Sequence, residues 1–425
     1  MGSRRAQNHR SLSDDSLTRL HEARVRTLCL AFHVHQPYRL ARCSSLEPLR
    51  ERSYVDSSAN ERIVRRIAER CYTPATQALE ETLRRLGGVA RVAFSITGTA
   101  LEQLASAAPG ALAAFQSLAQ TGCVDFLGET YYHSLASLYD DEEFRFQVER
   151  HAAALTAVVG VRPAVFRNTE LVYDDRTATL AAQLGFRGII AEGVDDVLVE
   201  RSPYGAYTSP CGVPLILRDY RSSDDIAFRF SHADDGQGKL SAGRFLERLG
   251  ARVPPHGVAL IYVDYETFGE HHVGTDGILD FLAELPGLAL DSGEWRCVSP
   301  VDVLTAECAR TELSFPRLTS WADTPRDLSA WAGNRMQQSA LQHAFDLGPA
   351  LRHRAAAGAL ETWRRLLSSD HFYYMATPRS GADMSVHASF SPYESPYEAF
   401  INFMNVVRHF RAIHLEGTPP LGALG

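Results

Sequence analysis

The chain has 425 residues, of which 45% are apolar and 22% are charged, as is typical of a globular protein with a full hydrophobic core. Its formal net charge of −8 argues against a nucleic acid or an anionic membrane as the partner, because both attract basic surfaces. No stretch is both long and apolar enough to cross a bilayer, so we expect no membrane-spanning segment.

The N-terminus and the cysteines suggest where the protein works. Residues 1–24 are polar and mixed in charge and lack the apolar core of a signal peptide, so we expect a flexible lead-in. The seven cysteines are scattered and form no CxxC pair, which disfavours a zinc knuckle or a redox motif. An odd, scattered set of cysteines fits a reducing compartment, and the cytoplasm is therefore the expected location.

Strand and helix patterns alternate up to about residue 300. Short apolar runs predict strands at 26–35, 89–96, 124–127, 163–168, 187–191, 215–218, 226–230 and 258–263. Apolar residues at helical spacing predict helices at 61–86, 100–107, 111–120, 140–159, 177–184, 242–249 and 275–284. Thr73-Pro74 is expected to split the first helix, and Thr99 and Thr275 to cap two others. Polar loops are expected at 221–225 and 231–242. This order of elements predicts a parallel α/β barrel.

The strand patterns fade towards the C-terminus. Helical periodicity there predicts helices at 328–345, 351–367 and 395–414. We therefore expect a barrel over 25–310, followed by a helical bundle over 311–425 that packs on the barrel and contributes to its site.

The first predicted strand ends on two histidines, His33 and His35, followed by Gln36 and Pro37. Alternate residues of a strand point to the same side, so both imidazoles are expected to share one face. A pair of structural histidines is the alternative, but two on one face beside Gln36 favour a ligand site.

Other predicted strands also end in polar clusters. The strand at 124–127 leads to Glu129 and His133 with tyrosines between them, a mixture that suits sugar recognition. An ordinary loop with a solvated Glu129 is the alternative. The strand at 163–168 leads to Glu170, and the run at 258–263 leads to Asp264.

Glu170 and Asp264 are the candidate catalytic pair, because each ends a buried strand inside a polar cluster. In the structural alternative, Glu170 caps the following helix and Asp264 accepts hydrogen bonds from backbone donors. For Glu266, Glu270 and Asp195, a structural or salt-bridging role is the favoured interpretation.

Five ordered motifs resemble those of glycoside hydrolase family 57, in particular its α-amylase and α-amylase-like branch. They are His33-Val-His-Gln-Pro37, Gly128-Glu-Thr-Tyr-Tyr-His133, Phe166-Arg-Asn-Thr-Glu170, Asp264-Tyr-Glu-Thr-Phe-Gly-Glu-His-His272 and Leu328-Ser-Ala-Trp-Ala-Gly-Asn334. The stretch Ser369–Met375 also resembles that branch, so the resemblance runs from about residue 27 to 410. It implies an incomplete (β/α)7 barrel followed by an α-helical bundle. It also implies retaining chemistry on α-glucans, with Glu170 as nucleophile and Asp264 as general acid/base.

A retaining glycosidase needs two carboxyl groups about 5–5.5 Å apart, one ionised and one protonated. A nearby cation such as Arg167 would keep Glu170 ionised, whereas apolar walls and the charge of Glu170 would hold a proton on Asp264. The residues expected to bind the sugar are His33, His35, Gln36, Glu129, His133, Arg167, Tyr173, Phe268, His271, His272, Trp321, Trp331, Asp370 and His371. A core role for Trp331 is an equal alternative, and at least one of His271 and His272 is expected to lie behind the residues that touch the sugar. We expect an α-glucan or maltooligosaccharide as substrate, with no cofactor and no metal.

Three other functions stay open at this point. A glucan transferase or branching enzyme would use the same pair of carboxyl groups. A metal-dependent deacetylase would use ligands from His33, His35, His271, His272 and Asp264, although the adjacent His271 and His272 do not match helical ligand spacing. A catalytically silent glucan-binding protein would keep only the fold.

Overall fold

The computed structural model describes residues 25–231, 238–354 and 357–416. The expected lead-in at 1–24 and half of the expected loop at 231–242 lie outside these residues. Within them, no helix combines the length and the apolar character that crossing a membrane requires.

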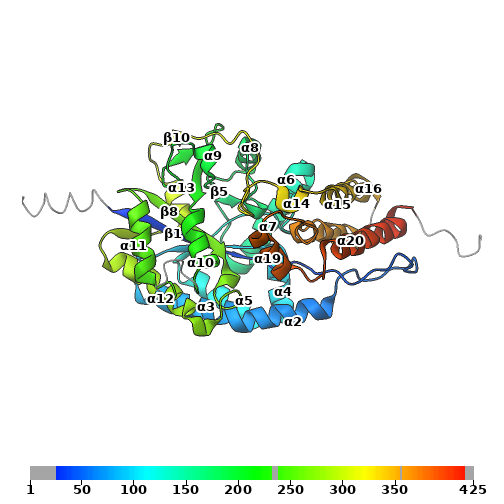
Figure 1. Ribbon diagram of the computed structural model, residues 1–425, viewed down its shortest axis with the longest axis horizontal. Coiled ribbons are helices and arrows are strands. Elements are labelled where there is room, and N and C mark those ends of the chain that lie inside the picture. Colours follow the sequence, from blue (N-terminus) through cyan, green and yellow to red (C-terminus); the bar gives the residue numbers. More distant parts are fainter. Residues whose placement is uncertain (1–24, 232–237, 355–356, 417–425) are drawn as a thin grey trace, which may run out of the picture.

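A ring of parallel strands forms the N-terminal part of the molecule (Figure 1). Its members are β1 (Arg26–Val34), β2 (Val92–Ile96), β3 (Val124–Phe126), β4 (Phe166–Arg167), β5 (Ile189–Glu192), β7 (Pro214–Arg218) and β8 (Val258–Asp264). Strand β8 pairs back onto β1, and a single bridge from Gly128 to Phe166 joins β3 to β4. The ring is incomplete, because β7 and β8 share only the pair Arg218 and Leu260. The predicted incomplete seven-stranded barrel is therefore confirmed.

Three short strands extend this sheet: β6 (Tyr207–Thr208), β9 (Trp295–Cys297) and β10 (Thr311–Glu312). Strand β1 is central, because it pairs with β2, β8 and β9 and is buried from Thr27 to Val34. Burial on both faces explains its continuous apolar run. The register places His33 opposite both Ser95 and Asp264, so the barrel brings these side chains to the same end.

Helices surround the barrel. They are α2 (Ser57–Ile67), α3 (Thr73–Arg85), α4 (Gly98–Ala107), α5 (Pro109–Gln120), α6 (Ala136–Tyr139), α7 (Asp141–Val159), α8 (Asp175–Gln183), α9 (Asp195–Leu198), α10 (Tyr220–Ala227), α11 (Ala242–Arg252), α12 (Ile278–Asp291) and α13 (Pro300–Thr305).

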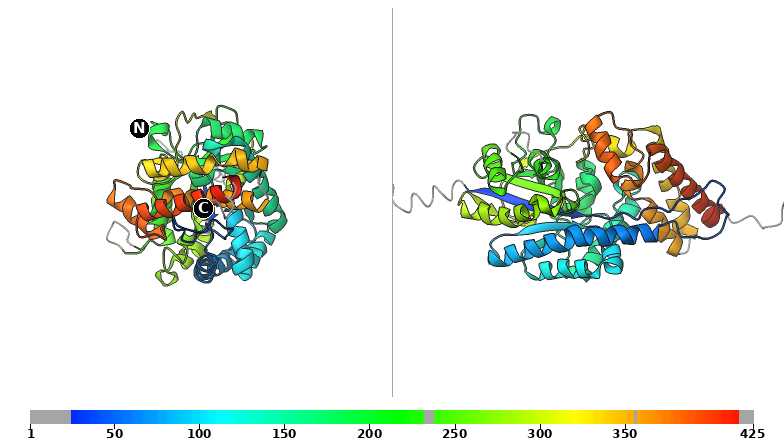
Figure 2. Two further views of the ribbon diagram at one scale, coloured as in Figure 1. Left: turned by 90° about the vertical axis from the view of Figure 1, so that its right-hand side faces the viewer. Right: turned by 60° about the horizontal axis from the view of Figure 1, so that its bottom comes forward.

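The expected break at Thr73-Pro74 is wrong, because a π-helical turn at Ala68–Tyr72 links α2 to α3. Pro74 lies in the first turn of α3, where its missing N–H costs little. Figure 2 shows the resulting blue rod along one side of the molecule.

The C-terminal helices pack at the other end of the molecule (Figure 1). They are α14 (Ser329–Ala332), α15 (Arg335–Phe345), α16 (Gly348–Arg354), α17 (Ala357–Leu366), α18 (Ser369–Tyr373), α19 (Gly381–Phe390) and α20 (Pro396–Arg411). One hydrophobic cluster includes Phe166 and Ile189 from the barrel and Trp363 and Phe403 from these helices. The helices and the barrel therefore share a core.

Four local predictions are corrected, namely one strand, one loop and the caps of two helices. The predicted strand at 226–230 and polar loop at 221–225 are wrong, because α10 covers Tyr220–Ala227 and Asp219 caps it by accepting from the Ser222 N–H. Thr97, and not Thr99, caps α4 by accepting from Ala100. Helix α12 begins after Gly277, whose left-handed backbone (φ 85°) ends the short turn containing Thr275.

Candidate active site

Glu170 lies in a strained turn directly after β4. Its φ is 57° and that of Leu171 is 49°, a region that non-glycine residues enter at a cost of about 1–3 kcal/mol. Backbone pairing holds this turn, since the Trp321 N–H donates to the Glu170 carbonyl at 3.1 Å and Tyr173 pairs with Thr319. The chain following the barrel thus fixes the backbone at Glu170.

Three side chains donate hydrogen bonds to the Glu170 carboxylate. His133 Nε2 and Ser369 Oγ reach Oε1 at 3.1 and 2.7 Å, and Trp321 Nε1 reaches Oε2 at 2.8 Å. The sequence predicted Trp321 only as a sugar-binding residue, and it did not indicate Ser369 as a partner of Glu170. Donors on both carboxylate oxygens fix the orientation of Glu170 and favour its ionised form.

The charges around Glu170 favour its carboxylate form. Burial raises the pKa of Glu170, but the charge and hydrogen bond of His133 outweigh it, so the pKa lies below its ordinary value. Burial lowers the pKa of His133, yet the Glu170 carboxylate raises it overall to about 9. The cation facing Glu170 is therefore His133, whereas the sequence suggested Arg167.

Asp264 ends β8 and is only partly exposed. Burial, followed by the negative charge of Glu170, raises the pKa of the Asp264 carboxyl to about 6. The two carboxyl groups therefore differ in protonation over the pH range between their pKa values. One is a candidate nucleophile and the other a candidate proton donor.

Three imidazoles stack beside this pair. The ring of His133 lies 4.0 Å from that of His35 and 5.0 Å from that of His33, which confirms that the two strand-end histidines share one face. Asp370 of α18 accepts from His35 Nε2 at 2.9 Å, so a helix of the C-terminal part reaches this site. His35, Asp370 and Trp321 each keep some exposed surface and can meet a ligand.

Glu129 and Arg167 lie beneath the histidines and are both fully buried. The Arg167 guanidinium donates to Glu129 Oε2 at 3.1 Å and lies over the rings of Tyr262 and Trp321. Since neither side chain is exposed, we assign them to the support of His133 and Trp321.

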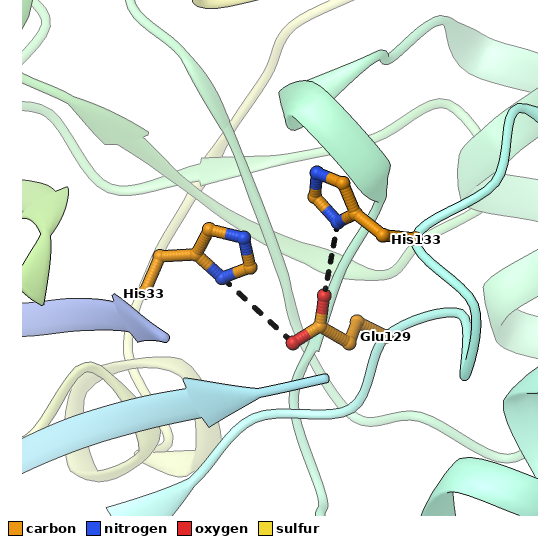
Figure 3. A group of neighbouring side chains, drawn as sticks. All are labelled: His33, Glu129 and His133. Atoms are coloured by element: carbon orange, nitrogen blue, oxygen red, sulfur yellow. Dashed lines mark ion pairs between the residues drawn. The ribbon is translucent and has the colours of Figure 1, made fainter. Parts of the chain in front are cut away.

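His33, Glu129 and His133 form a group whose ligating atoms lie within 4.8 Å of one another (Figure 3). These residue types suit a divalent metal ion. However, the Arg167 cation already neutralises Glu129, and His133 donates its Nε2 proton to Glu170. Because Arg167 already balances the negative charge of Glu129, the group fits a metal ion poorly.

Gln36 and Glu266 bind each other away from the histidine stack. Gln36 Nε2 donates to Glu266 Oε1 at 3.2 Å, and the Tyr72 hydroxyl donates to the same oxygen. Burial, with the nearby Asp264, raises the pKa of Glu266 to about 8. Glu266 and Gln36 therefore form a buried polar contact, which leaves Gln36 little surface to meet a sugar.

Four other predicted sugar ligands are core residues. Tyr173 packs on Phe315, Phe268 on Phe32, and His371 on Phe403, and Trp331 is fully buried. Sequence position alone placed them near the site, because each belongs to a motif or lies next to one. The core alternative for Trp331 is the one the structure supports.

Trp331→Ala is therefore expected to act on stability. Removing this buried indole leaves a cavity that lowers the free energy of unfolding by about 3–5 kcal/mol. Urea unfolding followed by circular dichroism measures this change. Trp331→Phe should keep the KM for a maltooligosaccharide unchanged, and a large rise in KM would return Trp331 to the sugar site.

His271 and His272 have different surroundings. His272 Nε2 lies 3.1 and 3.0 Å from the carbonyls of Ile226 and Ala227, so this ring holds the end of α10 and is the one of the two histidines placed behind the sugar contacts. His271 is exposed, and its ring meets Phe390 of α19 edge-on at 5.3 Å. It stays a predicted sugar contact.

Glu270 and Asp195 form ion pairs. Glu270 pairs with Arg66 at 2.7 Å, and Asp195 pairs with Arg221 at 2.9 Å. Both placements agree with the salt-bridging role favoured by the sequence.

Comparisons with known proteins show the family of the chain. The family model described as glycosyl hydrolase family 57 matches residues 29–315. A protein of Methanocaldococcus jannaschii named "Putative alpha-amylase" is 36% identical over 392 residues, covering 89% of this chain and 83% of its own length.

Solved structures share the fold at low identity. A family 57-type branching enzyme of Pyrococcus horikoshii superposes with a TM-score of 0.63 at 14% identity, covering 90% of this chain and 88% of its own. A 4-α-glucanotransferase of Thermococcus litoralis gives 0.57 at 15% identity and covers 89% of this chain, which spans 55% of that longer protein.

Proposed function

Because the chain belongs to glycosyl hydrolase family 57, we propose that it cleaves α-1,4 bonds of α-glucans with retention of anomeric configuration. One observation carries this proposal. Glu170 receives three hydrogen bonds that favour its ionised form, while the pKa of the nearby Asp264 is raised to about 6. An ionised and a protonated carboxyl group are the pair that double displacement needs.

In the first step Glu170 attacks the anomeric carbon, and the bond from that carbon to the glycosidic oxygen breaks. Asp264 gives its proton to the departing oxygen, so the leaving sugar carries a hydroxyl group. Glu170 then holds the sugar as an uncharged ester.

In the second step the ester no longer raises the pKa of Asp264, because the negative charge of Glu170 is gone. Asp264 takes a proton from water, whose oxygen attacks the anomeric carbon. The bond to Glu170 breaks, and the ionised Glu170 and protonated Asp264 are restored. An acceptor sugar in place of water would give glucan transfer from the same ester, so transfer is the alternative outcome.

The pH profile of kcat/KM is expected to be bell-shaped. Activity should fall as pH rises through about 6, where the pKa of Asp264 in the free enzyme lies and this carboxyl loses its proton. It should also fall in acid, below the depressed pKa of Glu170. His133→Gln removes the facing cation, so the acidic limb should move to higher pH. Initial rates on a maltooligosaccharide measure both limbs, and activity that increases with pH above 6 would contradict the assignment.

Incubation with maltooligosaccharides, amylose and pullulan, followed by sizing and linkage analysis of the products, tests the proposal. Shorter α-1,4 chains with new reducing ends support hydrolysis. Longer chains without new reducing ends support transfer, and new α-1,6 branch points support branching. Binding without any product would favour a silent glucan-binding protein.

The cytoplasm is the location that we propose for this activity. All seven cysteines are described and unpaired, as expected in a reducing compartment.

A further inference from the structure

Two arginines and two carboxylates form a charged cluster at one edge of the site, here called the four-charge cluster. Its members are Glu192, Arg218, Asp224 and Arg326. Both arginines contact both acids at 2.9–3.1 Å, and the side chains are between 0% and 16% exposed. Buried charges at this spacing are stable only when each is paired, so removal of one member affects the others.

The four-charge cluster joins two parts of the chain. Glu192 and Arg218 are register partners at the ends of β5 and β7, and Asp224 lies on α10. Arg326 comes from the loop between β10 and α14, where its φ of 48° is left-handed. A strained non-glycine residue is kept there only when its surroundings fix it, and here Glu192 and Asp224 do so.

Arg326 also contacts the segment that holds the nucleophile. Its Nη1 donates to the Trp321 carbonyl at 2.9 Å, and its own carbonyl accepts from the Ser320 N–H at 3.1 Å. Trp321 in turn donates to Glu170 twice, from its backbone and from its indole. Arg218 lies under the same indole at 5.7 Å. A continuous set of bonds thus runs from the four-charge cluster through Trp321 to Glu170.

We infer that Arg326 is a positioning residue, which aims the Trp321 indole at the Glu170 carboxylate by locking the 320–326 loop to the barrel. The inference rests on the proposed function, because it assigns Arg326 an effect on the nucleophile of that reaction. Within the described residues, the Arg326 side chain forms no hydrogen bond or ion pair with Glu170 and contacts Trp321, the two acids and the face of Tyr220.

Kinetics of Arg326→Ala test this inference. Because Glu170 loses its orientation in this variant, kcat should fall on the order of 10- to 100-fold, while KM should stay within about threefold of the wild-type value. The acidic limb of the pH profile should move to higher pH, since the pKa of Glu170 rises when its carboxylate loses the Trp321 donor. Arg326→Lys keeps one ion pair and should restore part of kcat. Arg317→Ala is the matched control, because Arg317 lies in the same segment but pairs with exposed Asp196, and it should behave like the wild type.

A double-mutant cycle separates an effect through Trp321 from a general one. In a Trp321→Phe background the indole donor is already absent, so adding Arg326→Ala should cost less than about threefold more in kcat. Independent, additive losses, or a wild-type kcat for Arg326→Ala at an unchanged melting temperature, would overturn the inference.

Fluorescence gives a readout that does not need turnover. Acrylamide quenching of Trp321 is the difference between each protein and the same protein carrying Trp321→Phe. This quenching should increase in Arg326→Ala and stay unchanged in Arg317→Ala. If the wild type cleaves no glucan, the proposed function fails while this measurement still decides whether Arg326 holds Trp321. Equal quenching in all three proteins would refute the inference in either case.

Discussion

Glu170→Gln is expected to lower kcat/KM for a maltooligosaccharide on the order of 10⁴-fold or more. The amide keeps the size of the side chain, but its single oxygen can accept from His133 or from Trp321 and not from both, and it cannot form the ester. Initial rates of new reducing ends measure the loss. Glu270→Gln is the matched control, because it weakens only ion pairs with the exposed Arg66 and Arg70 and should keep nearly full activity.

Chemical rescue sharpens this prediction. In Glu170→Ala, added azide can occupy the vacated space and attack the anomeric carbon of an activated α-glucoside, so the glycosyl azide should have the inverted, β configuration. An α-configured azide, or full activity of Glu170→Gln without azide, would show that Glu170 is not the nucleophile.

Asp264→Asn is expected to lower kcat on natural α-1,4 chains by about 10²- to 10⁴-fold, since the amide cannot transfer a proton at neutral pH. A substrate with a nitrophenolate leaving group needs no proton for departure. Its first step should therefore stay fast in the variant, while release of the sugar from Glu170 becomes slow. A rapid burst of nitrophenolate followed by a slow steady rate is the expected result.

Equal losses on the natural and the activated substrate would contradict the role of Asp264 as proton donor. Asp195→Asn serves as the control, because Asp195 forms an exposed pair with Arg221 and should leave both rates unchanged.

The strand ends were the part of the site that the sequence predicted well. A buried strand must stop where the polar residues begin, so the runs before Glu170 and Asp264 located both carboxyl groups. Period-two spacing also placed His33 and His35 on one face. These inferences depend on local pattern only, and the barrel ring then brought the strand ends together.

Contacts between distant segments could not be predicted in this way. Ser369 and Arg326 come from the C-terminal part of the chain, and no local pattern indicates which carboxylate each one meets. The cation facing Glu170 is His133, because the left-handed turn at Glu170 turns its carboxylate to that ring. Proximity in sequence had favoured Arg167, whose guanidinium is instead paired with Glu129.

Sequence patterns also misplaced residues that lie beside the motifs. The segment before Phe230 contains enough apolar residues for a short strand, but the Asp219 cap starts a helix that buries Ile226. Trp331 belongs to a motif, yet its face points into the core of the C-terminal helices. Burial of this kind depends on packing between elements, which a single sequence does not specify.

The anomeric configuration of the first product tests the central claim most directly. Proton NMR recorded during the first turnovers of a maltooligosaccharide distinguishes the α from the β reducing end before mutarotation mixes them. Double displacement through Glu170 and Asp264 predicts the α anomer first. A product that first appears as the β anomer would contradict the pair, because it would require water to attack in a single step from the face assigned to Glu170.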